Sequence, residues 1–202
     1  MTSTEVARIL LRRKAVLLRP RQLFTWASGI KAPIYTDNRK LISTVKERDY
    51  IVNELSRIIK KERCDLIAGT ATAGIPWAAF VAQKLKKPMI YVRAKPKDHG
   101  TSSTIEGELK KGQKVVVVED LISTGQSSLY TVSEIKRAGG KVLVCVALFT
   151  YGFKVAREDF ESHHVKLQTL TDIEFLLREA VKGKYIKKSD LSLVQSWRKQ
   201  FS

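Results

Sequence analysis

The sequence predicts an α/β fold in which a mainly parallel, twisted sheet is flanked by helices, with a small N-terminal hood. Three observations lead to this prediction. Short apolar runs rich in β-branched residues alternate with segments whose apolar residues recur at helical spacing. One run, Val115–Val118, consists of four valines, and such a strand needs cover on both faces. Gly-containing loops follow two of the runs. Alternating strands and helices are typical of a parallel sheet.

The N-terminal part is expected to form two helices and the hood. Helical spacing of apolar residues predicts the two helices, Thr2–Arg13 and Thr44–Arg63. Between them, Val16–Arg39 holds turn formers and aromatic residues, which predict short antiparallel strands and loops. Ser43 or Thr44, together with Glu47, is spaced as a capping box at the start of the second helix.

The central part is expected to alternate strands and helices. The predicted strands are Leu66–Ala68, Met89–Val92, Val115–Val118 and Val142–Phe149. The predicted helices are Pro76–Lys84, with Pro near the first turn, and Leu129–Arg137, closed by Gly139–Gly140. Parallel sheets bind ligands at the carboxyl ends of their strands. The loops after Ala68, Val92 and Val118 are therefore expected on one rim.

Length and composition indicate one cytoplasmic domain. A chain of 202 residues, 44% of them apolar, fits a single α/β domain over 1–202. We expect a hood of about 1–40, a core of about 41–178 and a helical tail of about 179–202. No apolar run approaches a membrane span, and the start lacks the pattern of a secretory signal. Cys64 and Cys145 lie in or beside strand-like sequence, which favours buried free thiols.

The net charge of +17 implies attraction for polyanions. Much of the excess lies in five runs, Arg12–Lys14, Lys60–Lys61, Lys84–Lys87, Lys110–Lys111 and Lys182–Lys188. Dispersed charge is typical of a solvated surface, whereas nucleic-acid binding needs a continuous stripe with stacking groups. No nucleic-acid partner is expected, although the sequence leaves open whether the charges converge.

The segment Val115–Ser128 carries the clearest chemistry. Glu119 and Asp120 follow the valine run, and a hydroxyl and glycine cluster then leads into a helix. Helix starts and loop amides attract phosphate, and carboxylates accept hydrogen bonds from ribose hydroxyls. The segment therefore predicts a sugar-phosphate site. The plainer alternative is a strand with an ordinary capped turn, which the acid pair disfavours.

This segment resembles the 5-phosphoribosyl-1-pyrophosphate (PRPP) motif of the type I phosphoribosyltransferases. Three further segments narrow the resemblance to the orotate phosphoribosyltransferase family, and more closely to its Gram-positive-like bacterial branch. Ser28–Arg39 looks like the family's orotate segment, Gly69–Pro76 like its pyrophosphate loop and Tyr91–Gly107 like its mobile catalytic loop. The order and spacing fit over essentially the whole chain. The resemblance implies a type I phosphoribosyltransferase fold.

The resemblance also implies a reaction, in which the 5-phosphoribosyl group moves from PRPP to orotate to give orotidine 5-monophosphate and pyrophosphate. Lys97, His99 and Asp120 are the implied catalytic residues, acting by charge stabilisation and loop closure without a protein nucleophile. Lys95 is a second candidate in the loop. The residues implied to bind PRPP are Arg93, Lys97, His99, Glu119, Asp120, Leu121, Ile122, Ser123, Thr124, Gly125, Gln126 and Ser127. Gln126 stands where the family usually has a small residue.

Other roles implied by the resemblance concern pyrophosphate and orotate. The implied pyrophosphate loop is Thr70, Ala71, Thr72, Ala73 and Gly74. The candidates for orotate are Ser123, Lys31, Tyr35 and Arg39. Some relatives carry Lys where this chain has Ala73, and one branch carries Lys where this chain has Ala27. Another cation would have to take the place of each missing Lys.

The implied cofactor is Mg²⁺, which PRPP would carry, and no direct metal ligands are expected because Mg²⁺ binds mostly through substrate phosphates. The implied assembly is a homodimer whose active sites are completed across the interface. Two alternatives remain from the sequence. One is a salvage transferase that uses PRPP with another base, and the other is an RNA-binding regulator with the same fold.

Overall fold

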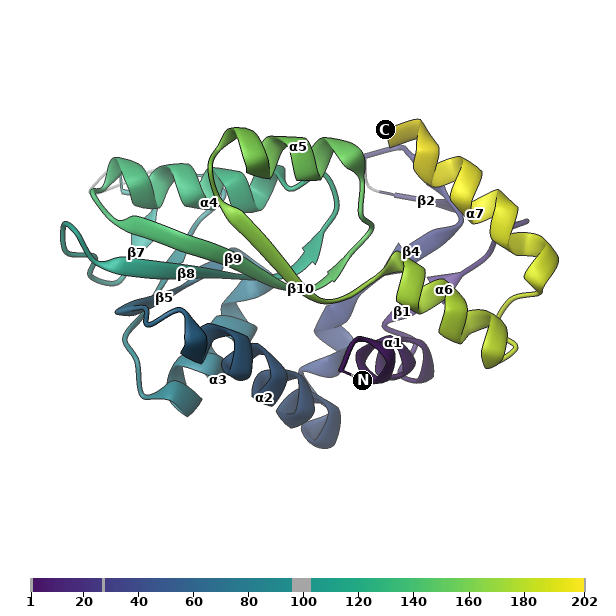
Figure 1. Cartoon of the computed structure of the whole chain (residues 1–202), viewed down its shortest axis with the longest axis horizontal. Helices are drawn as coiled ribbons and strands as arrows, with labels where there is room; N and C mark the ends of the chain where they lie inside the picture. Colours follow the sequence, from purple (N-terminus) through teal and green to yellow (C-terminus); the bar gives the residue numbers. More distant parts are fainter. Residues whose placement is uncertain (1, 27, 96–102, 202) are drawn as a thin grey trace.

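The computed structural model describes residues 2–26, 28–95 and 103–201. A six-stranded sheet lies at its centre, in the order β10-β9-β8-β5-β6-β7 (Figure 1). All neighbouring pairs are parallel except β6 and β7. The strands are β5 (Leu66–Thr70), β6 (Met89–Val92), β7 (Ile105–Glu106), β8 (Lys114–Ile122), β9 (Lys141–Thr150) and β10 (Lys166–Asp172). The predicted mainly parallel α/β fold is confirmed.

Helices cover both faces of this sheet (Figure 1). One face packs against α1, α2 and α3, and the other against α4 and α5. These helices are α1 (Thr2–Arg12), α2 (Val45–Lys61), α3 (Gly74–Leu85), α4 (Gln126–Arg137) and α5 (Lys154–Ser162). None of the helices in the described part of the chain is long and apolar enough to cross a membrane.

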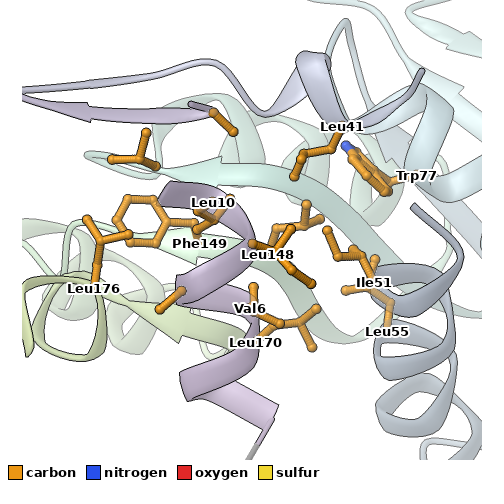
Figure 2. Close-up of a cluster of buried hydrophobic side chains, with 14 of the residues drawn as sticks. Val6, Leu10, Leu41, Ile51, Leu55, Trp77, Leu148, Phe149, Leu170 and Leu176 are labelled. Carbon is orange, nitrogen blue, oxygen red and sulfur yellow. The ribbon is translucent and has the colours of Figure 1, made fainter. Parts of the chain in front are cut away.

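The valine run shows why the sheet needs two covers. Val116 and Val118 belong to the apolar cluster beneath α1, α2 and α3, whereas Val115 and Val117 belong to the cluster that includes α4 residues. All four side chains are fully buried. Alternate side chains of a strand point to opposite faces, so one run of sequence builds both cores. Figure 2 shows the larger cluster, with Val6, Leu10, Leu41, Ile51, Leu55, Trp77, Leu148, Phe149, Leu170 and Leu176.

The hood consists of two short antiparallel pairs, as predicted. The pairs are β1 (Val16–Leu18) with β4 (Ile34–Thr36), and β2 (Phe24–Thr25) with β3 (Lys31–Ala32). A short 3-10 helix, Asn38–Leu41, then leads to α2. The chain ends in α6 (Ile173–Lys182) and α7 (Leu191–Arg198). Trp26 of the hood packs edge-on against Trp197 of α7 at 5.6 Å between ring centroids, which ties the hood to the tail.

The predicted capping box is wrong. Thr44 is the N-cap residue of α2, but its side chain makes no capping bond and its hydroxyl instead donates to the Leu41 carbonyl at 2.9 Å. Glu47 accepts from Arg13 Nε at 2.7 Å and from Arg12 at 3.4 Å. Two guanidiniums from α1 and the residue after it outcompete a single backbone amide for this buried carboxylate. Glu47 therefore joins α1 to α2.

Two predicted boundaries around the acid pair are also wrong. The strand does not end at Val118: β8 continues to Ile122, because β9 pairs with it over that length, through Leu121 with Phe149 and Ile122 with Thr150. The following helix begins at Gln126, three residues before the predicted Leu129. The acid pair consequently lies inside a paired strand. Both cysteines are free and buried, as predicted.

Candidate active site

The strands that precede the three predicted loops end on one rim of the sheet. β5 is flanked by β8 on one side and β6 on the other, and all three strands run parallel. Gly69 pairs with Val118, and Thr70 pairs with Val92. Their carboxyl ends therefore lie side by side. This rim is where a parallel sheet offers a ligand-binding crevice.

The acid pair divides into a buried and a half-buried carboxylate. Glu119 is only 4% exposed, and its carboxylate accepts from the Ser128 hydroxyl at 3.1 Å and from the Asp120 amide at 3.0 Å. Burial, followed by the charge of Asp120, raises the pKa of Glu119 well above its ordinary value. Burial also raises the pKa of Asp120, which its hydrogen bonds and the charge of Arg39 oppose. Glu119 is thus the member held more firmly in place, and Asp120 is the one that faces the rim.

The loop after β5 leads into Gly74, which lies directly against β8 beside Glu119. A Cβ atom on Gly74 would lie 2.5 Å from the Val118 carbonyl oxygen and 3.3 Å from a Glu119 carboxylate oxygen. Real side chains do not fit at such a distance, so this approach requires glycine. The Ala71 amide donates to the Val92 carbonyl at 3.0 Å, which joins the loop to β6 as well. The peptide bond between Ala71 and Thr72 is cis.

The loop after β8 ends in a helix N-terminus. Gly125 has a φ of +84°, a left-handed conformation that favours glycine, and it precedes the first residue of α4. Its Cβ would also lie 2.9 Å from the ring of Phe160. The first turn of α4 leaves the amides of Gln126, Ser127 and Ser128 without helical acceptors. Such amides are a favourable binding place for a phosphate.

A small aromatic cavity lies beside this rim. Its volume is about 160 Å³ and its lining consists of Trp26, Tyr35, Thr36, Leu121, Ser123 and Tyr151. The Tyr151 hydroxyl donates to the Thr36 hydroxyl at 2.9 Å. The Trp26 ring stacks on Tyr151 at 5.3 Å between centroids. The cavity is the size of a flat ring and combines aromatic faces with hydroxyl groups.

Two of the four orotate candidates, Ser123 and Tyr35, line this cavity. Lys31 is exposed on β3, and Arg39 pairs with Asp37 at 2.7 Å, so neither is among the lining residues. Arg39 lowers the pKa of Asp37 through this hydrogen bond. Its charge also acts on Asp120.

Sequence reasoning missed four residues of this region. Trp26, Thr36 and Tyr151 line the cavity, and Asn38 supports the acid pair. The Asn38 amide nitrogen donates to the Asp120 carbonyl at 2.8 Å, and the residue is fully buried. Asn38 lies within Ser28–Arg39, the segment that resembles the orotate segment, but the resemblance assigned it no role. The aromatic residues that follow the β9 strand in sequence offered a weak one.

The mobile-loop candidates are only partly described. Lys97 and His99 lie outside the residues that the structure describes. Arg93 follows β6, and its guanidinium pairs with Glu106 of β7 at 3.4 Å. The Arg93 amide donates to the Thr104 carbonyl at 2.9 Å. The described residues on either side of the predicted catalytic loop are therefore held together beside the rim.

Within residues 2–26, 28–95 and 103–201, no three His, Cys, Asp or Glu side chains form a group able to hold a metal ion. Glu119 and Asp120 are the carboxylates that this rim offers. Since Mg²⁺ keeps several waters and binds largely through substrate phosphates, Asp120, the member that faces the rim, suits an outer-shell role rather than a place in a protein cage.

Comparison with known proteins identifies the family. Residues 36–182 match the model of the phosphoribosyl transferase domain. The chain is 47% identical over 197 residues to the orotate phosphoribosyltransferase of Cytophaga hutchinsonii, covering 96% of this chain and 94% of that protein. The chain belongs to the orotate phosphoribosyltransferase family.

Other members of the orotate phosphoribosyltransferase family agree with this assignment. The Listeria innocua protein is 48% identical over 96% of this chain and 94% of its own length, which agrees with the Gram-positive-like branch. A solved member from Aeropyrum pernix is 32% identical, with a TM-score of 0.78 over 88% of this chain and 99% of that one. The type I phosphoribosyltransferase fold inferred from the sequence is confirmed.

Proposed function

We propose that this chain catalyses the transfer of the 5-phosphoribosyl group from PRPP to orotate, with release of pyrophosphate. One observation carries the proposal. The segment 119–127 presents the acid pair, then two residues of the aromatic cavity, then the phosphate-binding helix start. A ribose 5-phosphate joined to a planar base needs these three groups side by side.

In this mechanism Asp120 acts on the ribosyl group. Positive charge develops on the ribosyl carbon as pyrophosphate leaves, and a fixed carboxylate nearby stabilises it. Glu119 is held by Ser128 and the Asp120 amide, and it positions Asp120 rather than approaching the substrate. The aromatic cavity holds the base next to this carbon, and its polar groups are the hydroxyls of Tyr35, Thr36, Ser123 and Tyr151.

The leaving pyrophosphate is assigned to the loop of Thr70, Ala71, Thr72, Ala73 and Gly74. Because residue 73 is Ala, the loop itself supplies amides and hydroxyls but no cation. We assign the positive charge to Arg93, Lys97 and His99. Mg²⁺, bound to PRPP, would neutralise part of the charge on the departing phosphates.

The active form is proposed to be a homodimer in which the catalytic loop of one subunit completes the site of the other. Mixing tests this directly. Lys97→Ala and Asp120→Asn should each be nearly inactive alone, and a refolded mixture should regain up to about a quarter of wild-type activity through hybrid dimers. Light scattering should give twice the chain mass. No recovery in hybrids of confirmed composition would contradict sharing of the site.

A panel of bases separates this proposal from a salvage transferase. Orotate, uracil, adenine, guanine and hypoxanthine should be offered with PRPP and Mg²⁺, with pyrophosphate release as the common readout. The proposal expects release with orotate alone at a rate well above background. Faster release with a purine would replace it with the salvage alternative.

A further inference from the structure

Cations that are scattered along the sequence converge in the folded chain. A groove of about 790 Å³ runs between the loop after β1 and the segment joining α6 to α7. Its cations are Arg19, Arg21, Lys184, Lys187 and Lys188. An adjoining groove of about 320 Å³ adds Arg8, Arg12 and Lys182. Tyr185 lines both grooves, and the two together are hereafter called the basic groove.

The charge of the basic groove is largely uncompensated. Its lining includes two carboxylates, Glu179 and Asp190, against eight cations. Glu179 binds Arg8 at 2.6 Å and Asp190 binds Arg21 at 2.9 Å, while Arg12 is bound at 3.4 Å by Glu47, which lies outside the groove lining. Within the described part of the chain, the lysines of this groove and Arg19 form no salt bridge. Their charges are available to a polyanion.

Tyr185 gives the basic groove a stacking group. The side chain is 51% exposed, although large aromatic residues are usually buried. Its ring lies against the backbone of Gly183, where an added Cβ would be 2.7 Å from the ring. The ring atoms nearest to Gly183, Cε2 and Cδ2, lie on one edge of the ring, and about half of the side chain is open to solvent. An exposed ring flanked by cations is what a nucleobase stacks on.

We infer that the basic groove binds single-stranded RNA, with phosphates on its cations and a base on Tyr185. The spread of charge along the sequence indicated a solvated surface, but in the folded chain eight of these cations line the basic groove. A single strand is favoured over a duplex because only unpaired bases expose a face to a stacking ring. The lining residues of the basic groove do not include those of the aromatic cavity, so binding should leave orotate turnover unchanged.

Fluorescence anisotropy with a labelled single-stranded RNA of mixed sequence tests this inference on the full chain. Tyr185→Ala should weaken binding about tenfold, whereas Tyr185→Phe should retain it, because the stacking of one base is lost only in the first. Tyr130→Ala, at a 36% exposed tyrosine of α4, is the matched control and should bind like the wild type. Duplex RNA and inorganic polyphosphate of equal charge should compete less well than the single strand.

Salt dependence tests the lysines separately. Lys187→Ala with Lys188→Ala should reduce the slope of log affinity against log salt by about 1.4, since each phosphate contact on a single strand contributes about 0.7. Lys60→Ala with Lys61→Ala, on α2, is the matched control. Unchanged binding of Tyr185→Ala would overturn the inference. So would equal loss in the two lysine pairs, because that would mean attraction to overall charge.

Discussion

Asp120→Asn separates charge from shape at the acid pair. The Asp120 carbonyl accepts from the buried Asn38 amide at 2.8 Å, and its backbone lies within β8. The strand should therefore stay in place. The side chain keeps its size but loses the negative charge that faces the rim. Any loss of turnover then reports on electrostatics.

Loss of one oriented electrostatic group costs about 2–4 kcal/mol of transition-state stabilisation. This corresponds to a fall in kcat of about 30- to 1000-fold. The sign of the pH effect also follows. Burial raises the pKa of Asp120, so the active carboxylate should be lost as pH falls through that raised pKa. The wild-type rate should decline on the acid side, and the variant should lack the step that belongs to Asp120.

The assay is steady-state orotate loss at saturating PRPP and Mg²⁺, with circular dichroism to confirm folding. Asp65→Asn is the matched control, because Asp65 accepts from the Lys114 amide at the opposite end of β8. It should turn over like the wild type. A folded Asp120→Asn enzyme with wild-type kcat would refute the assignment of Asp120 to the ribosyl group.

Three further predictions use the same rim. Tyr151→Phe removes the hydrogen bond to Thr36 and should raise the KM for orotate about two- to tenfold while kcat changes less, as an orotate titration would show. Gly74→Ala places a Cβ against the Val118 carbonyl and should lower the free energy of unfolding by about 1–3 kcal/mol, with weaker PRPP binding by calorimetry. Glu119→Gln should stabilise the protein at neutral pH, measured by urea unfolding at two pH values. The raised pKa of Glu119 means that wild-type stability falls as pH rises above the ordinary glutamate pKa, because the folded state holds the proton longer.

The stability prediction has a matched control, and each of the three predictions has a contrary result. Glu108→Gln, at an exposed carboxylate, should leave stability unchanged at both pH values. If Glu119→Gln is less stable than the wild type at neutral pH, burial is not the main influence on the pKa of Glu119 in the wild-type protein. An unchanged KM for orotate in Tyr151→Phe would contradict the proposal that the aromatic cavity binds the base. Normal PRPP affinity in Gly74→Ala would contradict the proposal that the loop after β5 binds pyrophosphate.

The rim was predictable because it is encoded in short runs. A run of four valines has to be buried on both faces of a sheet, and the acids and glycines of the site follow it within a few residues. The strand end was misplaced because Glu119 and Asp120 look like a turn, whereas pairing with β9 keeps them extended. Tertiary pairing overrode local composition there.

The aromatic cavity was only partly predictable because three separated parts of the chain form it. Trp26 comes from the hood, Ser123 from the loop after β8 and Tyr151 from the residue that follows β9. Their meeting depends on how the hood docks, which no local pattern specifies. The ion pairs of Glu47 were also not predictable from local sequence, because its partners Arg12 and Arg13 lie at the end of α1 and directly after it, far before Glu47 in the chain.

The most direct test of the proposed reaction is turnover of orotate by the purified chain with PRPP and Mg²⁺, followed by orotate absorbance and product mass. We expect orotidine 5-monophosphate and pyrophosphate in equal amounts, and regeneration of orotate when both products are supplied. A folded protein that binds PRPP but converts no orotate in either direction would contradict it.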